Sequence, residues 1–351
     1  MTVPSTSDEQ KAISPLQRLQ KYTGKAIWPL LALVVVLIVN RLVAPDFFSV
    51  QLLQGRVYGS LIDILNRGAP VALLSIGMTL VIATKGIDLS VGAVIAISGA
   101  VAAVLISTTD LSPFVVILLS IGAGVLCGLW NGILVAFFDI QPIIATLILM
   151  VAGRGIAQMI TQGQIAIFND ETIAFMGTGL VLGIPFPIYL MVAMLILIYL
   201  LVRRTALGLF IESVGANDRA SHYAGVNAAL IKLLAYVISG ICAALAGLIL
   251  TGDIKGADAN NSGLWLELDA ILAVVLGGTA LTGGRFSLVL SVIGALIIQS
   301  VETGILLSGL PPTFNLVVKA IVILFVLLLQ SEAFRRMISV GVLRLRTGRA
   351  A

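Results

Sequence analysis

The chain has 351 residues, of which 59% are hydrophobic and only 11% are charged, with a formal net charge of +4. A water-soluble protein carries roughly 25% charged residues, so this composition excludes a soluble enzyme or binding protein and indicates a surface that lipid solvates. The positive charge does not indicate nucleic-acid binding, because the basic residues lie in short polar stretches between apolar segments, as in membrane proteins.

Apolar segments recur along the whole chain and predict an all-α, polytopic integral membrane protein. Residues 1–25 are polar and are expected to form an N-terminal tail. The segment 26–43 is too long for the apolar core of a cleaved signal, which has roughly 7–15 residues, so it predicts a retained first helix. We expect about ten transmembrane helices within 26–331. The expected spans are 26–43, 66–84, 91–107, 112–138, 143–162, 185–202, 229–251, 268–282, 286–307 and 314–331.

The distribution of basic residues predicts the orientation. An even number of spans places both termini on one side, and the side rich in Lys and Arg is cytoplasmic. We therefore expect both termini, the basic tail 332–351 and the connection 203–228 to be cytoplasmic. The basic residues on that side are Lys11, Arg18, Lys21, Lys25, Arg203, Arg204, Arg219, Arg335, Arg336, Arg344, Arg346 and Arg349.

Two expected spans, 91–107 and 268–282, are short for a full crossing, and each follows a polar, glycine-containing turn. GIDLSVGAVIA (86–96) and GLWLELDAILA (263–273) share a glycine, a carboxylate and a following apolar run. Short or broken helices at matching places of two halves are typical of inverted-topology repeats. The match is loose, so chance similarity between apolar segments stays open. Gly124, Gly128 and Gly132 predict close helix packing, with a pore wall as the alternative.

The first candidate functional segment is IATKGIDLSVGAVIAIS (82–98), which interrupts an apolar region with Lys85 and Asp88. Asp88 and Ser90 are typical N-cap residues, so one interpretation is a structural cap. The other is a broken helix beside a translocation pathway. Arg154, within MVAGRGIAQMI, must face the bundle interior or find a partner, since a charge at membrane depth costs roughly 2.5–3.5 kcal/mol.

Polar residues gather again in GDIKGADANNSGLWLELDA (252–270). This set suits sugar hydroxyl groups, with an indole ring for sugar C–H groups; it equally suits a solvated loop or a docking site for a protein. Its pathway candidates are Asn260, Asn261, Trp265, Glu267 and Asp269. Glu302 and Lys319 lie near the outer ends of the last two spans and are expected at the membrane interface.

The connection RRTALGLFIESVGANDRASHYAGVN (203–227) predicts helix around Glu212–Tyr223. It is either an inert connector or a lever that another subunit moves. The chain has a single histidine, no G-x-x-x-x-G-K-[ST] phosphate loop and no H-E-x-x-H or G-x-S-x-G motif. We therefore expect no enzymatic activity, no cofactor and no metal site.

NRGAPVALLSIGMTLVIATKGIDLSVGAV, QPIIATLILMVAGRGIAQMIT and TALGLFIESVGANDRASHYAGVN resemble the sugar-import permeases of bacterial ATP-binding-cassette (ABC) transporters, in the ribose-type branch. DIKGADANNSGLWLELDAILAVVLGG and SVIGALIIQSVETGILLSGLPP are most similar to members that import galactofuranose. Lys85, where many relatives carry glycine, is a departure without an obvious consequence.

This resemblance implies ten helices in inverted halves in a bacterial inner membrane, with a monosaccharide such as galactose or galactofuranose, or another pentose or hexose, as cargo. It implies partner ATPase subunits, a second and distinct permease and a periplasmic sugar-binding protein. The segment Gly215–Gly225 would be the coupling helix that contacts the ATPase. The coupling residues would be Glu212, Gly215, Asn217, Asp218, Arg219, His222 and Gly225. An ion-coupled carrier is the alternative, weakened because interior carboxylates are few and lie near span ends.

Overall fold

The computed structural model describes residues 15–53, 55–309, 311 and 314–330. Most of the expected N-terminal tail and all of the expected tail 332–351 lie outside these residues. The described chain is mostly helical, as the composition predicts. Its long helices are α1 (Pro15–Val43), α2 (Ser60–Ala83), α3 (Val91–Thr108), α4 (Pro113–Ala136), α5 (Pro142–Ile160), α7 (Phe186–Arg204), α10 (Ala228–Ile254), α11 (Leu266–Leu276), α12 (Leu288–Leu307) and α13 (Asn315–Gln330).

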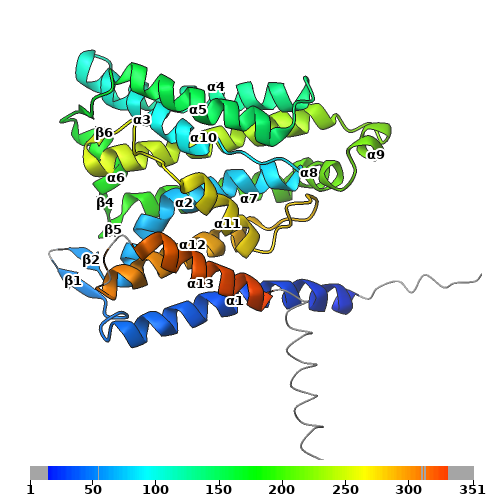
Figure 1. Ribbon diagram of the computed structural model, residues 1–351, viewed down its shortest axis with the longest axis horizontal. Coiled ribbons are helices and arrows are strands. Elements are labelled where there is room, and N and C mark those ends of the chain that lie inside the picture. Colours follow the sequence, from blue (N-terminus) through cyan, green and yellow to red (C-terminus); the bar gives the residue numbers. More distant parts are fainter. Residues whose placement is uncertain (1–14, 54, 310, 312–313, 331–351) are drawn as a thin grey trace, which may run out of the picture.

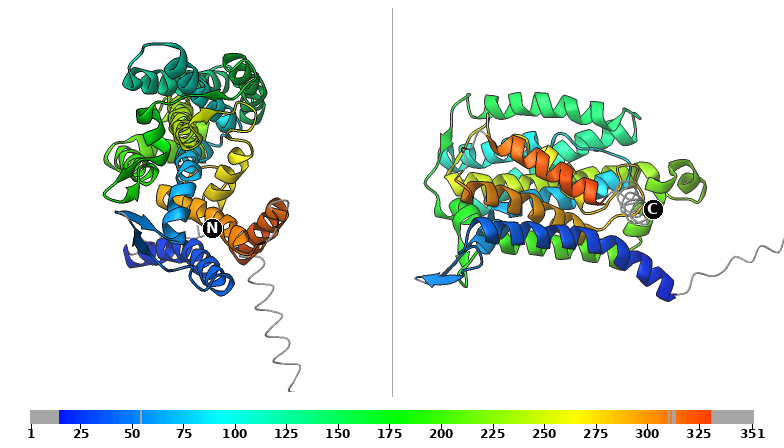
Figure 2. Two further views of the ribbon diagram at one scale, coloured as in Figure 1. Left: turned by 90° about the vertical axis from the view of Figure 1, so that its left-hand side faces the viewer. Right: turned by 60° about the horizontal axis from the view of Figure 1, so that its bottom comes forward.

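The long helices run roughly along one direction, and the short elements gather at the two ends of the bundle (Figures 1 and 2). One end carries the strands and α6 (Glu171–Thr178), and we call it the strand end. The other end carries α8 (Leu207–Ala216) and α9 (Asp218–Tyr223), and we call it the α8–α9 end. The strand pairs are β1 (Gln51–Leu53) with β2 (Arg56–Tyr58), β3 (Ala166–Ile167) with β6 (Gly256–Ala257), and β4 (Leu180–Val181) with β5 (Ile184–Pro185), all antiparallel.

Seven of the described helices are both long and apolar enough to cross a membrane, namely α2, α3, α4, α5, α7, α10 and α12. Their ends agree with the expected spans to within a few residues, except that α2 begins at Ser60, before the expected residue 66. The expected span 268–282 is helical only over Leu266–Leu276. These findings confirm a multi-pass membrane protein.

Helices α2 and α10 form the centre of the bundle, and most of their residues are buried. In Figure 1, α3, α4 and α5 lie on one side of this centre, and α12, α13 and α1 lie on the other. The glycine stripe of α4 packs closely, as predicted, and the structure identifies its partner as α10. A Cβ atom on Gly128 would lie only 2.5 Å from the carbonyl oxygen of Tyr236, so only glycine lets these two backbones approach so closely.

Candidate functional site

The connection between α2 and α3 re-enters the bundle as extended chain. Helix α2 ends at Ala83 near the α8–α9 end, and residues 84–90 then run back among α4, α5 and α10 before α3 begins. The Tyr236 hydroxyl and the Thr146 hydroxyl both donate to the Ile87 carbonyl, at 3.5 and 3.2 Å. Non-helical backbone is tolerated at membrane depth only where protein surrounds it, and these donors meet that requirement.

Asp88 is the centre of a buried hydrogen-bond network that holds this segment. Its carboxyl group is 2% exposed. The backbone N–H and the hydroxyl of Ser90 donate to Oδ1 at 3.1 and 2.6 Å, the Ser239 hydroxyl donates to Oδ2 at 2.9 Å, and Asn131 Nδ2 donates to Oδ1 at 3.4 Å. Asp88 thus joins the re-entrant segment to α4 and α10.

The network differs from the predicted helix cap. Ser90 occupies the N-cap position of α3 but makes no side-chain cap bond, and its hydroxyl instead accepts from Asn131 at 2.8 Å. Asp88 closes the turn before the helix by accepting the Ser90 N–H. The side chains of Asp88 and Ser90 therefore bond to each other and to neighbouring helices rather than to the first turn of α3.

Helix α11 has a similar entry from the opposite end of the bundle. After β6, residues 258–265 turn back into the bundle, with Gly263 at φ 72° and Trp265 at φ 67°. The first turns of α3 and α11 then meet, because a side chain on Gly92 would collide with the Gly263 carbonyl and the Glu267 carboxylate. Glu267 is 2% exposed, and its Oε2 accepts no hydrogen bond from the described residues.

Side chains of α5 hold the segment that precedes α11. Arg154 Nη1 donates to the carbonyl oxygens of Ala259 and Ser262, at 3.1 and 2.6 Å. Gln158 donates to Asn260 at 2.6 Å. Arg154 therefore finds its partners in backbone carbonyls of the neighbouring segment.

The remaining polar candidates of this segment are exposed or lie away from the junction of α3 and α11. Asn260, Asn261 and Trp265 are exposed. Asn261 Nδ2 donates to Asp258 at 2.7 Å, and chiefly for this reason the pKa of the Asp258 carboxyl lies below its ordinary value. Asn260 and Asn261 thus order the loop itself.

Lys319, expected near the outer end of its span, is buried within the protein. Lys319 on α13 is 8% exposed, and its Nζ lies 2.7 Å from Oδ2 of the buried Asp269 on α11 and 3.9 Å from Glu302 on α12. A buried charge requires a partner, and the fold supplies one from a helix 50 residues away in the chain.

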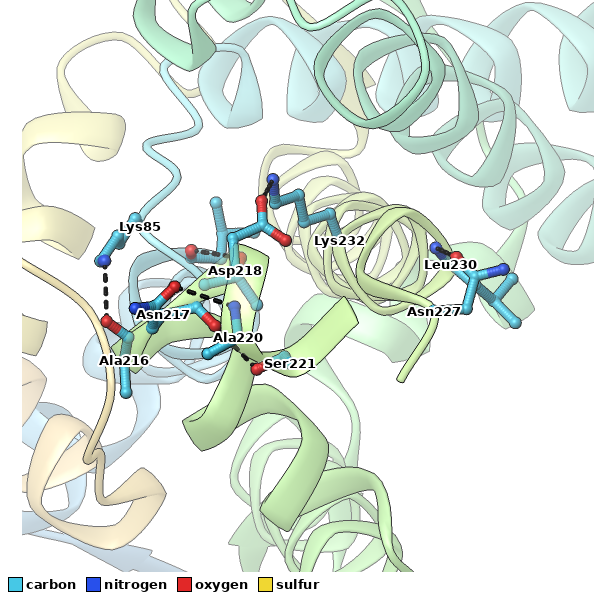
Figure 3. A network of polar contacts seen from close by, with 11 residues as sticks. Lys85, Ala216, Asn217, Asp218, Ala220, Ser221, Asn227, Leu230 and Lys232 are labelled. Carbon is cyan, nitrogen blue, oxygen red and sulfur yellow. Dashed lines mark hydrogen bonds and ion pairs between the residues drawn. The ribbon is translucent and has the colours of Figure 1, made fainter. Parts of the chain in front are cut away.

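The α8–α9 end carries the expected coupling residues, of which Figure 3 shows Asn217 and Asp218. The predicted helix over Glu212–Tyr223 is in fact two helices that meet at Asn217, whose Oδ1 accepts the Ala220 N–H at 3.0 Å and thereby caps α9. Lys232 of α10 forms an ion pair with Asp218. Arg219, His222 and Gly225 are exposed, whereas Gly215 is buried and Glu212 is half-buried.

Three elements meet beside Gly215. The Gly284 N–H donates to the Ala83 carbonyl at 2.8 Å, and a Cβ on Gly215 would lie 2.5 Å from the Gly284 nitrogen and closer still to the Ala83 carbonyl. Lys85 Nζ donates to the Ala216 carbonyl at 3.1 Å. This bond gives Lys85 a role that the sequence did not reveal. The backbone of Lys85 is left-handed, with φ 66°, a conformation that glycine adopts more readily.

Two hollows flank the Asp218–Lys232 pair. One of about 470 Å³ is lined by Arg219, His222 and Tyr223 of α9, and the other, of about 190 Å³, lies beneath the re-entrant segment at Lys85 and Gly86. Asp218 and Lys232 line both. The pair thus lies between α9 and the start of the re-entrant segment.

A third cavity, of about 400 Å³, lies near the strand end and contains residues that sequence reasoning missed. We call it the strand-end cavity. Its polar lining comes from β2, α2, α10 and α12, and includes Asp63, Asn66, Arg67, Asp253, Gln299 and Glu302. The available signal was the spacing of Asp63, Asn66 and Arg67, which lie three and four residues apart and so share one helix face. Glu302 was expected from the sequence at the membrane interface, and none of the pathway candidates named from the sequence lines this cavity.

Apolar helices long enough to span a membrane, with two interrupted helices among them, define a multi-pass membrane protein. The family described as branched-chain amino acid transport system, permease component, matches residues 60–327. The chain belongs to this family, in its branch of ABC sugar permeases, and the resemblance expected from the sequence is confirmed.

Curated relatives cover most of the chain. The galactofuranose transporter permease protein YtfT of Escherichia coli (strain K12) is 61% identical over 88% of this chain and 91% of its own length. The fructose import permease protein FruF of Bifidobacterium longum is 39% identical, over 87% of each chain. The ribose import permease protein RbsC of Haemophilus influenzae is 37% identical, over 85% of this chain and 90% of its own. No solved structure matches the chain.

Proposed function

We propose that this chain is the permease subunit of an importer that carries galactofuranose, or a closely related galactose sugar, across the inner membrane. The observation that supports this cargo is the 61% identity to the galactofuranose transporter permease over 88% of the chain. The relatives named for fructose and ribose are less similar, at 39% and 37%. As a transport permease the chain is not an enzyme, and the proposal assigns ATP hydrolysis to separate ATPase subunits.

We further propose ten spans arranged as inverted repeats, in which α1, α11 and α13 join the seven long helices. The two interrupted helices support this arrangement, because α2 with α3 and α10 with α11 repeat the same order of helix, re-entrant segment and helix. The two units enter from opposite ends of the bundle, and their second helices meet at Gly92 and Glu267. This is the relation that inverted halves produce.

The α8–α9 end faces the cytoplasm in this proposal, and the strand end faces the periplasm. Arg203 and Arg204 at the end of α7, with Arg219 on α9, support this orientation by the positive-inside rule. A periplasmic sugar-binding protein would then dock at the strand end. A second, distinct permease would pack against one of the apolar faces that α4, α5 and α7 leave exposed.

The pair α8–α9 is the element through which an ATPase would move the permease. Its support is geometric: α9 presents Arg219, His222 and Tyr223 to the exterior, and Tyr223 is 89% exposed. Gly215 at the end of α8 contacts the Ala83 carbonyl and the Gly284 nitrogen. ATP binding favours one position of α8–α9, and the two re-entrant helices follow because ligands shift the populations of existing conformations.

Reconstitution with the ATPase, the partner permease and the binding protein tests this function. Asp218→Lys breaks the pair with Lys232 and should lower sugar uptake per ATP about fivefold or more, a typical allosteric coupling, while insertion stays normal. The exchange Asp218→Lys with Lys232→Asp should restore uptake. Concentrative uptake by the permease alone, without an ATPase, would overturn the proposal in favour of an ion-coupled carrier.

A further inference from the structure

The strand-end cavity is lined by polar side chains, and one of them has a buried oxygen without a partner among the described residues. Gln299 of α12 is only 5% exposed, and it lines the cavity. Asn66 Oδ1 on α2 is also buried and accepts no hydrogen bond from the residues that the structure describes. A buried polar atom without a partner costs roughly 1–3 kcal/mol. The unpartnered Asn66 Oδ1, in a cavity that the amide of the largely buried Gln299 also lines, therefore points to a ligand that supplies the missing bond.

We propose that the strand-end cavity is a monosaccharide-binding site contained within this single chain, lined by Asn66, Gln299, Asp63, Arg67 and Asp253. The site rests on the proposed sugar-import function and adds to it a place where the cargo is held. Its volume of about 400 Å³ lies within the range of small-molecule pockets, roughly 300–1,000 Å³.

The chemistry of the lining favours a neutral polyol over an ion or a lipid tail. The two amides offer both donors and acceptors, the carboxylates of Asp63 and Asp253 accept, and the Arg67 guanidinium donates. A sugar hydroxyl both donates and accepts, so it can satisfy every one of these groups. A divalent cation would favour a cluster of acidic ligands, and the described residues contain no group of three metal-ligating side chains. A lipid tail would leave the amides unsatisfied.

The cavity also contacts the interrupted helix α11. Leu266, the first residue of α11, lines its wall. Glu302 lines it as well and lies 3.9 Å from Lys319, which in turn pairs with Asp269 of α11. A sugar that occupies the cavity would therefore touch the element that must move during transport. The sugar would bind at this site first, after it enters from the strand end.

A labelling experiment tests the site. Leu306 lines the cavity and is 52% exposed, so Leu306→Cys gives a thiol at its edge. The native cysteines Cys127 and Cys242 are replaced by alanine, and the assembled transporter without binding protein is labelled with a membrane-impermeant maleimide. D-Galactose, D-ribose or D-fructose should slow the labelling. At a sugar concentration of ten times the dissociation constant, the rate falls about elevenfold.

Two sets of variants show whether the slowing arises in the cavity. Gln299→Leu and Asn66→Leu should each weaken the apparent affinity about two- to tenfold, the effect of one hydrogen bond. Gln158→Leu is the matched control, because this amide lies on α5 and bonds to Asn260. Met159→Cys, which is 80% exposed on α5, should label at the same rate with and without sugar.

Three results would overturn the site. The first is that none of the three sugars slows the labelling of Leu306→Cys at about 100 mM, well above typical small-molecule dissociation constants. The second is that a sugar still slows this labelling in the double variant Gln299→Leu, Asn66→Leu. The third is that the sugar slows the labelling of Met159→Cys as much as that of Leu306→Cys. Sugar uptake by the complete transporter is measured in parallel. If uptake persists while protection fails, the cavity assignment falls and the import function stands; if uptake itself fails, the import function falls.

Discussion

The pair formed by Asp269 and Lys319 is expected to anchor the interrupted helix α11 against α13. The Nζ and Oδ2 atoms lie 2.7 Å apart, and the two side chains are 13% and 11% exposed. Removing one partner of a buried ion pair leaves an uncompensated charge, which costs about 3–5 kcal/mol. Asp269→Asn and Lys319→Met should each destabilise the folded protein by that amount.

Thermal unfolding of the purified protein in detergent measures the effect. At about 2 °C per kcal/mol, each single substitution should lower the melting temperature by about 6–10 °C. The double substitution removes both charges and should recover most of this loss, since neutral replacements of a buried pair are often tolerated. Lys255→Met, which removes an exposed lysine, serves as the control and should change stability by less than about 0.5 kcal/mol.

The double substitution decides whether the reasoning holds. If it is as unstable as the sum of the two single substitutions, the charges do not compensate one another and the pair does not anchor α11. If either single substitution leaves the melting temperature unchanged, the burial of these charges has no energetic consequence, and the same conclusion follows.

Two further predictions concern the re-entrant segment and its contact with α8. Gly215→Ala should force α8 away from Ala83 and lower sugar uptake per ATP in the reconstituted transporter, with Gly155→Ala, which has open space around it, as an unaffected control; equal uptake by both would refute the contact as a coupling route. Asp88→Leu leaves several buried donors without an acceptor, at about 1–3 kcal/mol each, and should abolish expression of folded protein, whereas Asp88→Asn keeps one acceptor oxygen and should retain most transport. Equal loss in both variants would assign Asp88 a role beyond hydrogen bonding.

Local features of the sequence were sufficient for the bundle and for part of the helix packing. Hydropathy is read along the chain and needs no partner, so the long spans could be predicted to within a few residues. The Gly124–Gly132 stripe predicted a close helix contact for a similar reason, because small side chains at four-residue spacing form a smooth face whatever lies opposite.

The sequence also located the two interruptions, since glycine and carboxylate residues in an apolar region are visible without a structure. It did not show that the segments at Asp88 and Glu267 lead to helices whose first turns meet. That contact joins residues more than 170 positions apart, and no pattern within either segment specifies the other.

The sequence by itself determined that this is a membrane protein, at which residues its helices are interrupted, and which polar connection lies outside the apolar spans. Each of these follows from the residues of a single stretch. Only the tertiary structure decided that Lys319 is buried against Asp269, that Lys85 bonds to the end of α8, and that Asn66 and Gln299 share a cavity. The physical reason is that the burial and the bonding partners of a charge or an amide depend on packing, and packing brings together segments that are distant in the chain.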